Sequence, residues 1–370
     1  VRNKDQTILS EKDLIKENQK QINLELLEKN QNGKDINFKP IEAKKTNNTE
    51  ITNEVTLVGT HLEDQLIEKI KSNDYLHPFL NINLPKSLKI EKFKKLDLIL
   101  KKEFDVIVVA VSSLGIEWFV NQISKKYRND LPIILLTKGL SIIEGELTTL
   151  SEKIKILLKK ENYKKINISA IKGPCLASGL ASKIRTGTVI ANPEIKVAQE
   201  LKKIFETKYY SMEVSNDLNG VELSGAIKNI YSMLIGAAEG LSGSKNLDKD
   251  KSNNHLNTSA SLIHRSISEM VEFVSHYGGN SDTVYGLAGL GDLYVSAIGG
   301  RNSLMGKYLG QGYLYKEAKK KFMKDITVEG AELAIEIGPK ILKDLNSKHF
   351  PLMFSLLATI CDNKKLEINW

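Results

Sequence analysis

The stretch Asp105-Val106-Ile107-Val108-Val109-Ala110-Val111 decides the fold class of this chain. After Asp105 every residue of the stretch is apolar, and all but one of these are β-branched. A short, continuous apolar run of this kind is typical of a strand buried on both faces of a parallel sheet. The run ends at Ser112-Ser113, and helical spacing follows over residues 116–123. We therefore expect a strand that leads into a helix.

The same alternation extends outward from this strand. Further strands are expected at residues 55–58, 132–137 and 166–171, with helices at residues 62–70 and 147–160. Strands that alternate with helices imply right-handed crossovers and a doubly wound sheet. Beyond about residue 215 the pattern becomes purely helical, over residues 221–241, 258–277, 313–323 and 328–345. The predicted fold is an α/β Rossmann-like N-terminal domain plus an all-α C-terminal domain.

Composition divides the chain into three parts. Residues 1–53 are rich in Lys, Asn, Gln and Glu and poor in aromatic residues, so we expect a polar segment that is partly disordered. Residues 54–215 form the predicted Rossmann-like dinucleotide-binding domain. Residues 216–370 form the predicted all-helical domain, which holds substrate and the catalytic group.

Composition also excludes several classes of protein. Two cysteines in 370 residues rule out a disulfide scaffold or a cysteine-rich zinc module, and we expect no metal. No apolar run reaches the roughly 18 residues of a membrane span, so we expect a cytoplasmic protein without a membrane partner. The net charge is +8, but the lysines are scattered and lack interleaved aromatics. We expect no nucleic-acid partner, and the positive excess suits an anionic small-molecule substrate.

Two strand ends carry residues suited to ligand binding. In open parallel sheets, ligands bind at the carboxyl ends of the strands. One strand ends in Thr137-Lys138-Gly139, which places an ammonium group beside a glycine. Another ends in Lys172-Gly173-Pro174-Cys175-Leu176-Ala177-Ser178, whose small residues allow a flat ring or a phosphate to approach the backbone. Taken alone, a lysine after a strand is more often simply solvated.

The predicted helix at residues 221–241 contains a lysine within apolar sequence. Lys228 lies between Ile227 and Ile230, with Gly225 and Ala226 just before it. Desolvation lowers the pKa of a lysine toward the range of a general base. A lysine that extends its ammonium group to solvent is the equally good alternative from this segment alone.

A third segment favours an anion. Gly289-Leu290-Gly291-Asp292-Leu293 is followed by Ser296 and then by Gly299-Gly300-Arg301-Asn302-Ser303. Glycine-rich backbone that leads into Asn302 or Ser303 as a helix cap offers free N–H groups, and Arg301 adds a two-pronged donor. Together these residues favour a phosphate site over a set of plain turns.

From about residue 54 to the C-terminus, the chain resembles the NAD(P)-dependent glycerol-3-phosphate dehydrogenase family. Each motif is unspecific alone, but all of them in order are highly specific. The family combines a Rossmann domain with an all-helical domain. The resemblance rests on residues 137–139, 173–177, 222–229, 289–293, 300–302 and 328–330.

The resemblance implies a reversible hydride transfer between sn-glycerol 3-phosphate and NAD(P)+, giving dihydroxyacetone phosphate and NAD(P)H. It places the protein in glycerol-3-phosphate metabolism and phospholipid biosynthesis, with NAD or NADP as cofactor and a homodimer as the expected assembly. Lys228 matches the proton-accepting lysine. The substrate-binding positions are Lys138, Asn229, Asp292, Ser296, Arg301 and Asn302, and the cofactor-binding positions are Gly173, Ala177, Arg301 and Glu329.

The chain departs from the family near its start. The glycine-rich turn that receives the cofactor pyrophosphate should lie before residues 54–59, which resemble the second Rossmann strand, but no G-x-G-x-x-G occurs there. Thr60 and His61 stand where the two cofactors are distinguished. One alternative is therefore a catalytically impaired or truncated relative that keeps the phosphate site and binds the dinucleotide poorly. Another is a hydroxyacid or sugar-acid dehydrogenase, which the Arg301-Asn302 loop disfavours.

Overall fold

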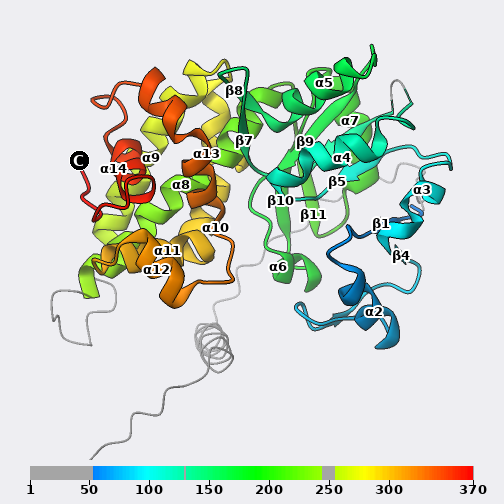
Figure 1. The fold of residues 1–370 in the computed structure, drawn as a ribbon, viewed down its shortest axis with the longest axis horizontal. Coiled ribbons are helices and arrows are strands. Elements are labelled where there is room, and N and C mark those ends of the chain that lie inside the picture. The colour runs from blue at the N-terminus through cyan, green and yellow to red at the C-terminus, as the bar shows by residue number, and fades with distance from the viewer. Residues whose placement is uncertain (1–52, 129–130, 244–254, 370) are drawn as a thin grey trace, which may run out of the picture. The chain divides into compact units, whose positions relative to one another are not determined.

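The computed structural model describes residues 53–128, 131–243 and 255–369, all within one compact unit, Thr52–Trp370. An α/β region is followed by a helical region, as the sequence predicts (Figure 1). The expectation for residues 1–53 lies, apart from Asn53, outside the described residues. Within the described ranges no helix is both long enough and apolar enough to cross a bilayer.

A five-stranded sheet forms the centre of the α/β region (Figure 1). The strands of this sheet lie in the order β11 (Tyr210–Ser215), β10 (Thr186–Ala191), β9 (Ile168–Lys172), β6 (Ile133–Leu135) and β5 (Ile107–Val109). The predicted strands are β9, β6 and β5, and each is shorter than its predicted range.

The sheet is mixed, which corrects the expectation of a doubly wound parallel sheet. β5, β6 and β9 run parallel to one another, but β10 is antiparallel to β9. The connection from β9 to β10 contains only the five-residue helix α6 (Ala177–Ala181). Because this helix is too short to cross back over the sheet, the chain turns at the carboxyl end of β9 and returns alongside it.

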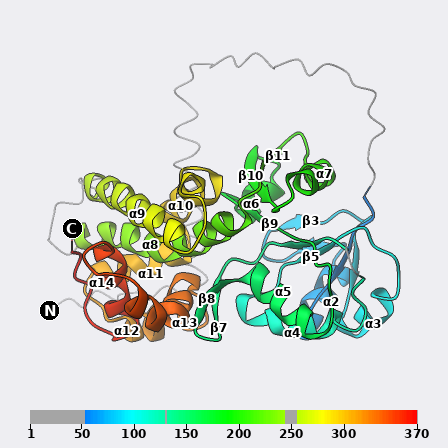
Figure 2. The same cartoon turned by 90° about the horizontal axis from the view of Figure 1, so that it is seen from above.

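Helices cover both faces of the five-stranded sheet (Figure 2). Successive side chains of a strand point to opposite faces. Ile133 and Leu135 of β6 therefore pack with α4 (Ile116–Ile123) and α5 (Leu150–Lys160). Ile134 points the other way and packs with α7 (Ile195–Phe205). Burial on both faces explains the continuous apolar runs of the sequence.

The predicted strand at residues 55–58 forms as β1 (Thr56–Val58), but outside the five-stranded sheet. β1 pairs in parallel with β4 (Lys89–Glu91) in a sheet of two strands. The helix α2 (Asp64–Ser72) lies beside it and forms the helix expected at residues 62–70. The core of this small unit consists of Ile67, Ile70 and Ile90. The short elements around it are β2 (Leu76–His77), β3 (Ile82–Asn83), η1 (Phe93–Lys95) and α3 (Leu96–Ile99).

One predicted helix is wrong at its start. Residues 147–149 belong to β8 (Glu146–Thr149), which forms an antiparallel hairpin with β7 (Leu140–Ile143). The helix α5 begins only at Leu150, because the hydroxyl of Thr149 accepts a hydrogen bond from the backbone N–H of Glu152. A threonine in this position caps a helix and holds its own backbone extended.

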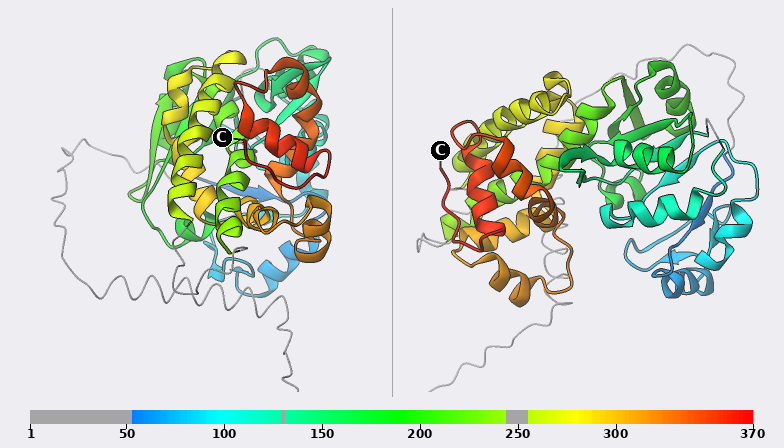
Figure 3. Two further views of the ribbon diagram at one scale, coloured as in Figure 1. Left: turned by 90° about the vertical axis from the view of Figure 1, so that its left-hand side faces the viewer. Right: turned by 45° about the horizontal axis from the view of Figure 1, so that its top comes forward.

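The helical region surrounds one buried helix, α8 (Leu218–Gly243) (Figures 2 and 3). The four predicted helices form as α8, α9, α12 and α13, with ends within three residues of those expected. The other members of the region are α9 (Leu256–His276), η3 (Ser281–Tyr285), η4 (Leu287–Gly291), α10 (Asp292–Ile298), α11 (Arg301–Gly310), α12 (Tyr315–Phe322), α13 (Glu329–Asp344) and α14 (Pro351–Ile360).

Helices α8 and α11 pack backbone against backbone. A Cβ atom added to Gly306 would lie 1.8 Å from the carbonyl oxygen of Met233, and one added to Gly240 would lie 2.0 Å from that of Lys307. The glycines in these helices weaken them locally but allow this close approach. Helix α11 is therefore fixed against the helix that carries Lys228.

Candidate active site

A buried lysine and a buried aspartate meet between α8 and α10. Lys228 lies in the interior of α8 with 3% of its surface exposed, and Asp292 is the first residue of α10. The Lys228 Nζ donates a hydrogen bond to Asp292 Oδ1 at 2.8 Å and another to Ser296 Oγ, one turn further along α10. The alternative of a lysine that extends to solvent is thus excluded at this position.

A second lysine reaches the same carboxylate from the α/β region. Lys138 follows β6, and its ammonium group forms an ion pair with Asp292 Oδ2. Its side chain is 25% exposed, whereas that of Asp292 is 4% exposed. The two oxygens of one carboxylate therefore hold two ammonium groups, one from each region of the protein.

This arrangement changes the proton affinity of the Lys228 amine. The pKa of Lys228 is lowered to about 8, and the largest cause is burial, because the charged form loses its hydration. The nearby ammonium group of Lys138 also lowers this pKa, while the carboxylate of Asp292 opposes both effects. A neutral amine is thus accessible near physiological pH, as proton abstraction requires.

Asparagine side chains connect α8 with the starts of α11 and α13. Asn302 Nδ2 donates to Asn229 Oδ1 at 3.1 Å, and the backbone N–H of Gly330 donates to Asn302 Oδ1 at 2.9 Å. The expectation that Asn302 or Ser303 caps a helix is wrong. Gly300, with a φ of 130°, occupies the cap position, and α11 begins at Arg301. The cap position has a positive φ, which glycine adopts more easily than other residues. The helix therefore starts before Asn302, and Asn302 and Ser303 lie inside its first turn.

Arg301 lies at the open edge of this group. Its Nη2 forms an ion pair with Glu329 Oε1 at 2.8 Å, and both side chains are about half exposed. The guanidinium group is thus accessible to a ligand at the N-terminus of α11, where backbone N–H groups favour an anion.

These side chains line one cavity of about 240 Å³. Eight of the ten predicted site residues lie around it: Lys138, Lys228, Asn229, Asp292, Ser296, Arg301, Asn302 and Glu329. The cavity is also lined by Cys175, Leu176, Val295, Gly299 and Gly300, which were not among the predicted site residues. Leu176 and Cys175 belong to the segment Lys172–Ser178 after β9, so this segment could have pointed to both of them.

Gly173 and Ala177, the other two predicted residues, do not line the cavity. Gly173 is buried with a φ of 131°, and a Cβ atom there would lie 3.1 Å from Thr188 Cα of β10. Close packing of β9 against β10 therefore demands glycine at this position. Ala177 begins α6 and is exposed. Both positions follow the carboxyl end of β9, where we expect the cofactor from the sequence.

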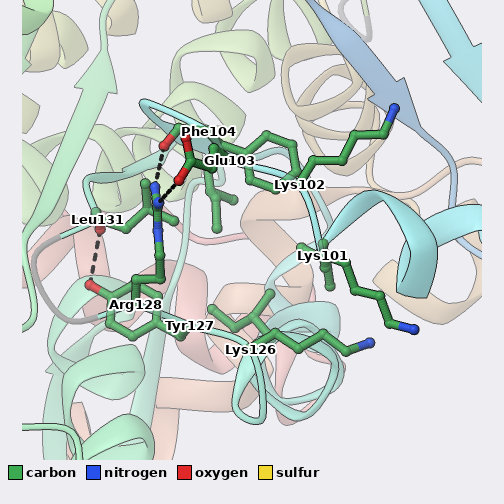
Figure 4. Close-up of a pocket in the computed structure, with 11 residues that line it drawn as sticks. Lys101, Lys102, Glu103, Phe104, Lys126, Tyr127, Arg128 and Leu131 are labelled. Atoms are coloured by element: carbon green, nitrogen blue, oxygen red, sulfur yellow. Dashed lines mark hydrogen bonds and ion pairs between the residues drawn. The ribbon is translucent and has the colours of Figure 1, made fainter.

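A second cavity, of about 350 Å³, lies at the opposite ends of the strands (Figure 4). Its lining includes Ile107, the first residue of β5, and several basic side chains. Arg128 donates to the carbonyl oxygen of Phe104 at 2.6 Å and lies 4.0 Å from the carboxylate of Glu103. With the arginine engaged in this way, the paired lysine and aspartate mark the smaller cavity as the reactive site.

The described residues fit one end of a dinucleotide better than the other. The segments that follow β6 and β9 reach the cavity, because Lys138, Cys175 and Leu176 line it. The turn between β1 and α2 contains Thr60, where we expect the two cofactors to be distinguished, and there the carboxylate of Glu63 accepts the backbone N–H of Thr60 at 2.6 Å. A carboxylate there repels phosphate and occupies a donor that the phosphate would use.

The cavity lies at the carboxyl ends of the sheet strands, and the helical region supplies it with a buried lysine. This combination defines a two-domain dehydrogenase of the Rossmann type. Family models support a narrower assignment. The N-terminal part of NAD-dependent glycerol-3-phosphate dehydrogenase matches residues 43–198, and its C-terminal part matches residues 217–368.

Individual relatives agree with the family models. An NADP(+)-dependent glycerol-3-phosphate dehydrogenase of Archaeoglobus fulgidus is 30% identical over 320 residues, which cover 85% of this chain and 90% of the relative. A glycerol-3-phosphate dehydrogenase [NAD(P)+] of Fusobacterium nucleatum is 32% identical, covering 77% and 78% of the two chains. The chain belongs to the NAD-dependent glycerol-3-phosphate dehydrogenase family.

A solved structure shows the same fold. The crystal structure of glycerol-3-phosphate dehydrogenase from Coxiella burnetii superposes with a TM-score of 0.67 at 24% identity, covering 84% of this chain and 88% of that one. The prediction of a Rossmann-like domain followed by a helical domain is confirmed.

Proposed function

We propose that this protein is a glycerol-3-phosphate dehydrogenase, which interconverts sn-glycerol 3-phosphate and dihydroxyacetone phosphate with NAD(P)+ and NAD(P)H. Family membership supports the reaction class. The observation that carries the proposal for this chain is the pair of lysines on one buried carboxylate, inside a cavity that also holds Arg301 and Asn302. A base beside an anion-binding group fits a phosphorylated alcohol.

Lys228 is the proposed general base. Its amine is poised by burial and by the Lys138 cation, with a pKa of about 8. In the oxidation it accepts the proton of the substrate C2 hydroxyl, and in the reduction it returns that proton to the carbonyl oxygen. Asp292 and Ser296 accept hydrogen bonds from the amine and so fix its direction.

Lys138 is the proposed electrostatic partner of the reacting oxygen. Its ammonium group stabilises negative charge on that oxygen as the proton leaves. The same cation disfavours protonation of Lys228. Asp292 holds the two ammonium groups together, which would otherwise repel each other.

The phosphate of the substrate belongs, in this proposal, at the start of α11. Arg301 offers two parallel N–H donors, the first turn of α11 offers backbone N–H groups, and Asn302 with Asn229 lines the same wall. Replacing Arg301 with alanine should raise the KM for dihydroxyacetone phosphate by about tenfold or more. An unchanged KM would contradict the assignment.

The cofactor is NAD or NADP, and its nicotinamide ring, when bound, accepts or supplies the hydride of the C2 position. We place that ring beside the cavity, near Gly173, Ala177, Arg301 and Glu329. No specific observation supports the alternative of an impaired relative, and the N-terminal family model covers most of the α/β region. A cytoplasmic location and a homodimer are part of the proposal.

The proposal is tested by following the oxidation of NADH in the presence of dihydroxyacetone phosphate. We expect turnover with this substrate and none with dihydroxyacetone, which lacks the phosphate. NADH is compared with NADPH in the same assay. A well-folded full-length chain that turns over neither cofactor would overturn the proposal.

A further inference from the structure

A third lysine lies beneath the site and takes no part in the reaction described above. Lys172 is the last residue of β9, and only 2% of its surface is exposed. It does not line the 240 Å³ cavity. Burial of an ammonium group is costly unless hydrogen bonds and opposite charge compensate it, so a lysine in this position calls for a structural reason.

The hydrogen bonds of Lys172 lead directly to the turn that carries Lys138. Its Nζ donates to the carbonyl oxygen of Thr137 at 2.8 Å and to that of Leu135 at 3.1 Å. Leu135 ends β6, and Thr137 immediately precedes Lys138. A single ammonium group therefore ties the carboxyl end of β6 to the carboxyl end of β9.

Helix α8 is shaped to accommodate the Lys172 side chain. A Cβ atom on Gly225 would lie 3.2 Å from both Cγ and Cδ of Lys172, so glycine leaves room for the aliphatic stem. Glu222, one turn earlier on α8, is also buried, with 1% of its surface exposed. Its charge favours the protonated form of Lys172, against the desolvation that lowers the pKa of Lys172 to about 8.

Glu222 itself is anchored on a further element. Its Oε1 accepts the backbone N–H of Ser151, in the first turn of α5, at 3.1 Å. Its Oε2 has no hydrogen-bond partner among the described residues. Burial raises the pKa of Glu222, and the ammonium group of Lys172 opposes this rise. The two charges thus depend on each other inside the protein.

We propose that Lys172 is a positioning residue, which fixes the Thr137-Lys138-Gly139 turn so that the Lys138 ammonium group stays on Asp292. This inference rests on the proposed function. An apolar residue at position 172 would remove the Lys172 donor from both carbonyl oxygens, and the turn would loosen. Lys138 would then move away from the carboxylate that it shares with Lys228.

Loosening of the turn has a definite electrostatic consequence. Lys138 lowers the pKa of Lys228, whereas Asp292 raises it. When Lys138 withdraws, the first effect weakens and the second strengthens, so the pKa of Lys228 rises. The charged groups that face these amines from the surrounding elements are Glu222, Lys138 and Asp292 around Lys172, and Lys138, Asp292 and Glu329 around Lys228.

The test uses the full chain with Lys172→Met, alone and together with Glu222→Gln. The double variant removes both buried charges, so it keeps the test available if the single variant fails to fold. The matched control is Lys126→Met. Lys126 has a side chain that is 26% exposed and pairs with Asp97, outside the site.

We expect kcat for glycerol 3-phosphate oxidation to fall about tenfold in the Lys172 variants, with a smaller change in KM. The acid limb of the pH profile should move upward by about half a pH unit. The control should leave both unchanged. A folded Lys172 variant whose acid limb stays in place would overturn the proposal, even if its melting temperature falls.

A second measurement separates this inference from the proposed function. Amide hydrogen exchange at residues 137–140 is recorded without any ligand, and it should accelerate in the Lys172→Met and Glu222→Gln double variant but not in Lys126→Met. If the wild-type chain lacks turnover while this exchange changes as expected, the proposed reaction fails and the positioning role stands. Unchanged exchange would overturn the positioning role.

Discussion

The helical region and the α/β region each send one lysine to Asp292, and the two lysines differ in burial. Lys228 comes from the interior of α8 and is 3% exposed. Lys138 comes from a turn at a strand end, and its side chain is 25% exposed. The α8 amine has lost its hydration, which favours its neutral form, whereas the turn amine keeps contact with water. Identical side chains thus gain different chemistry from the elements that carry them.

The largest expected effect comes from removing the buried amine. Lys228→Ala should lower kcat by about a thousandfold or more, because it removes the amine that accepts the proton in the proposed reaction. Binding of dihydroxyacetone phosphate, measured by calorimetry, should be largely retained because the Arg301 group is untouched. Lys307→Ala, on the exposed side of α11, is the control. A kcat within tenfold of wild type would contradict the role of Lys228 as the general base, and with it the difference proposed between the two lysines.

The second effect tests whether tight packing is what holds α8 in place. Gly306→Ala puts a methyl group 1.8 Å from the Met233 carbonyl oxygen, and backbone atoms cannot easily yield. We expect a loss of about 3 kcal/mol in unfolding free energy, seen as a lower melting temperature by calorimetry. Gly179→Ala in α6 meets nothing within 4 Å and is the matched control. Equal melting temperatures of Gly306→Ala and wild type would show that α8 and α11 can move apart without loss of stability.

A smaller effect is expected at the other lysine. Lys138→Ala should lower kcat/KM by about ten- to a hundredfold through lost stabilisation of the reacting oxygen. Because the Lys138 cation lowers the pKa of Lys228, its removal should move the acid limb of the oxidation to higher pH. Initial rates across pH measure both changes. An acid limb that moves downward would reverse the assigned roles.

The smallest effect needs no mutation. With a Lys228 pKa of about 8, oxidation at pH values below 8 should slow by about tenfold per pH unit, as the amine becomes protonated. The reduction needs the protonated amine, so it should decline above pH 8 instead. Initial rates in both directions on one preparation show whether the two limbs cross there. Profiles with the same slope in both directions would contradict a single titrating amine.

The sequence predicted those parts of the fold in which one pattern dominates. Uniform apolar runs gave the cores of β5, β6 and β9, and helical spacing gave α8 and α13. The β7–β8 hairpin was missed because Leu147 also fits the helical spacing of α5, and only the cap formed by Thr149 decides where that helix starts. The direction of β10 depends on the length of α6, which the apolar pattern does not report.

The site was predicted where a motif places charge beside glycine, as at Lys138, Asp292 and Arg301. Lys172 lies in the same kind of motif, yet its role could not be predicted. In sequence it follows an apolar strand just as a solvated lysine does, and its burial depends on Gly225, more than fifty positions later. Asn302 was predicted in the site but with the wrong backbone role, because the cap depends on the φ angle of Gly300.

In the proposed function, the carboxylate of Glu329 competes with the substrate phosphate for the guanidinium group of Arg301. In the structure, the guanidinium group already holds a carboxylate. An incoming phosphate must displace that carboxylate. The favourable free energy of phosphate binding is therefore reduced by the free energy of the ion pair that is lost. The affinity for phosphate is thereby moderated, so that substrate and product can both dissociate, as a reversible reaction requires.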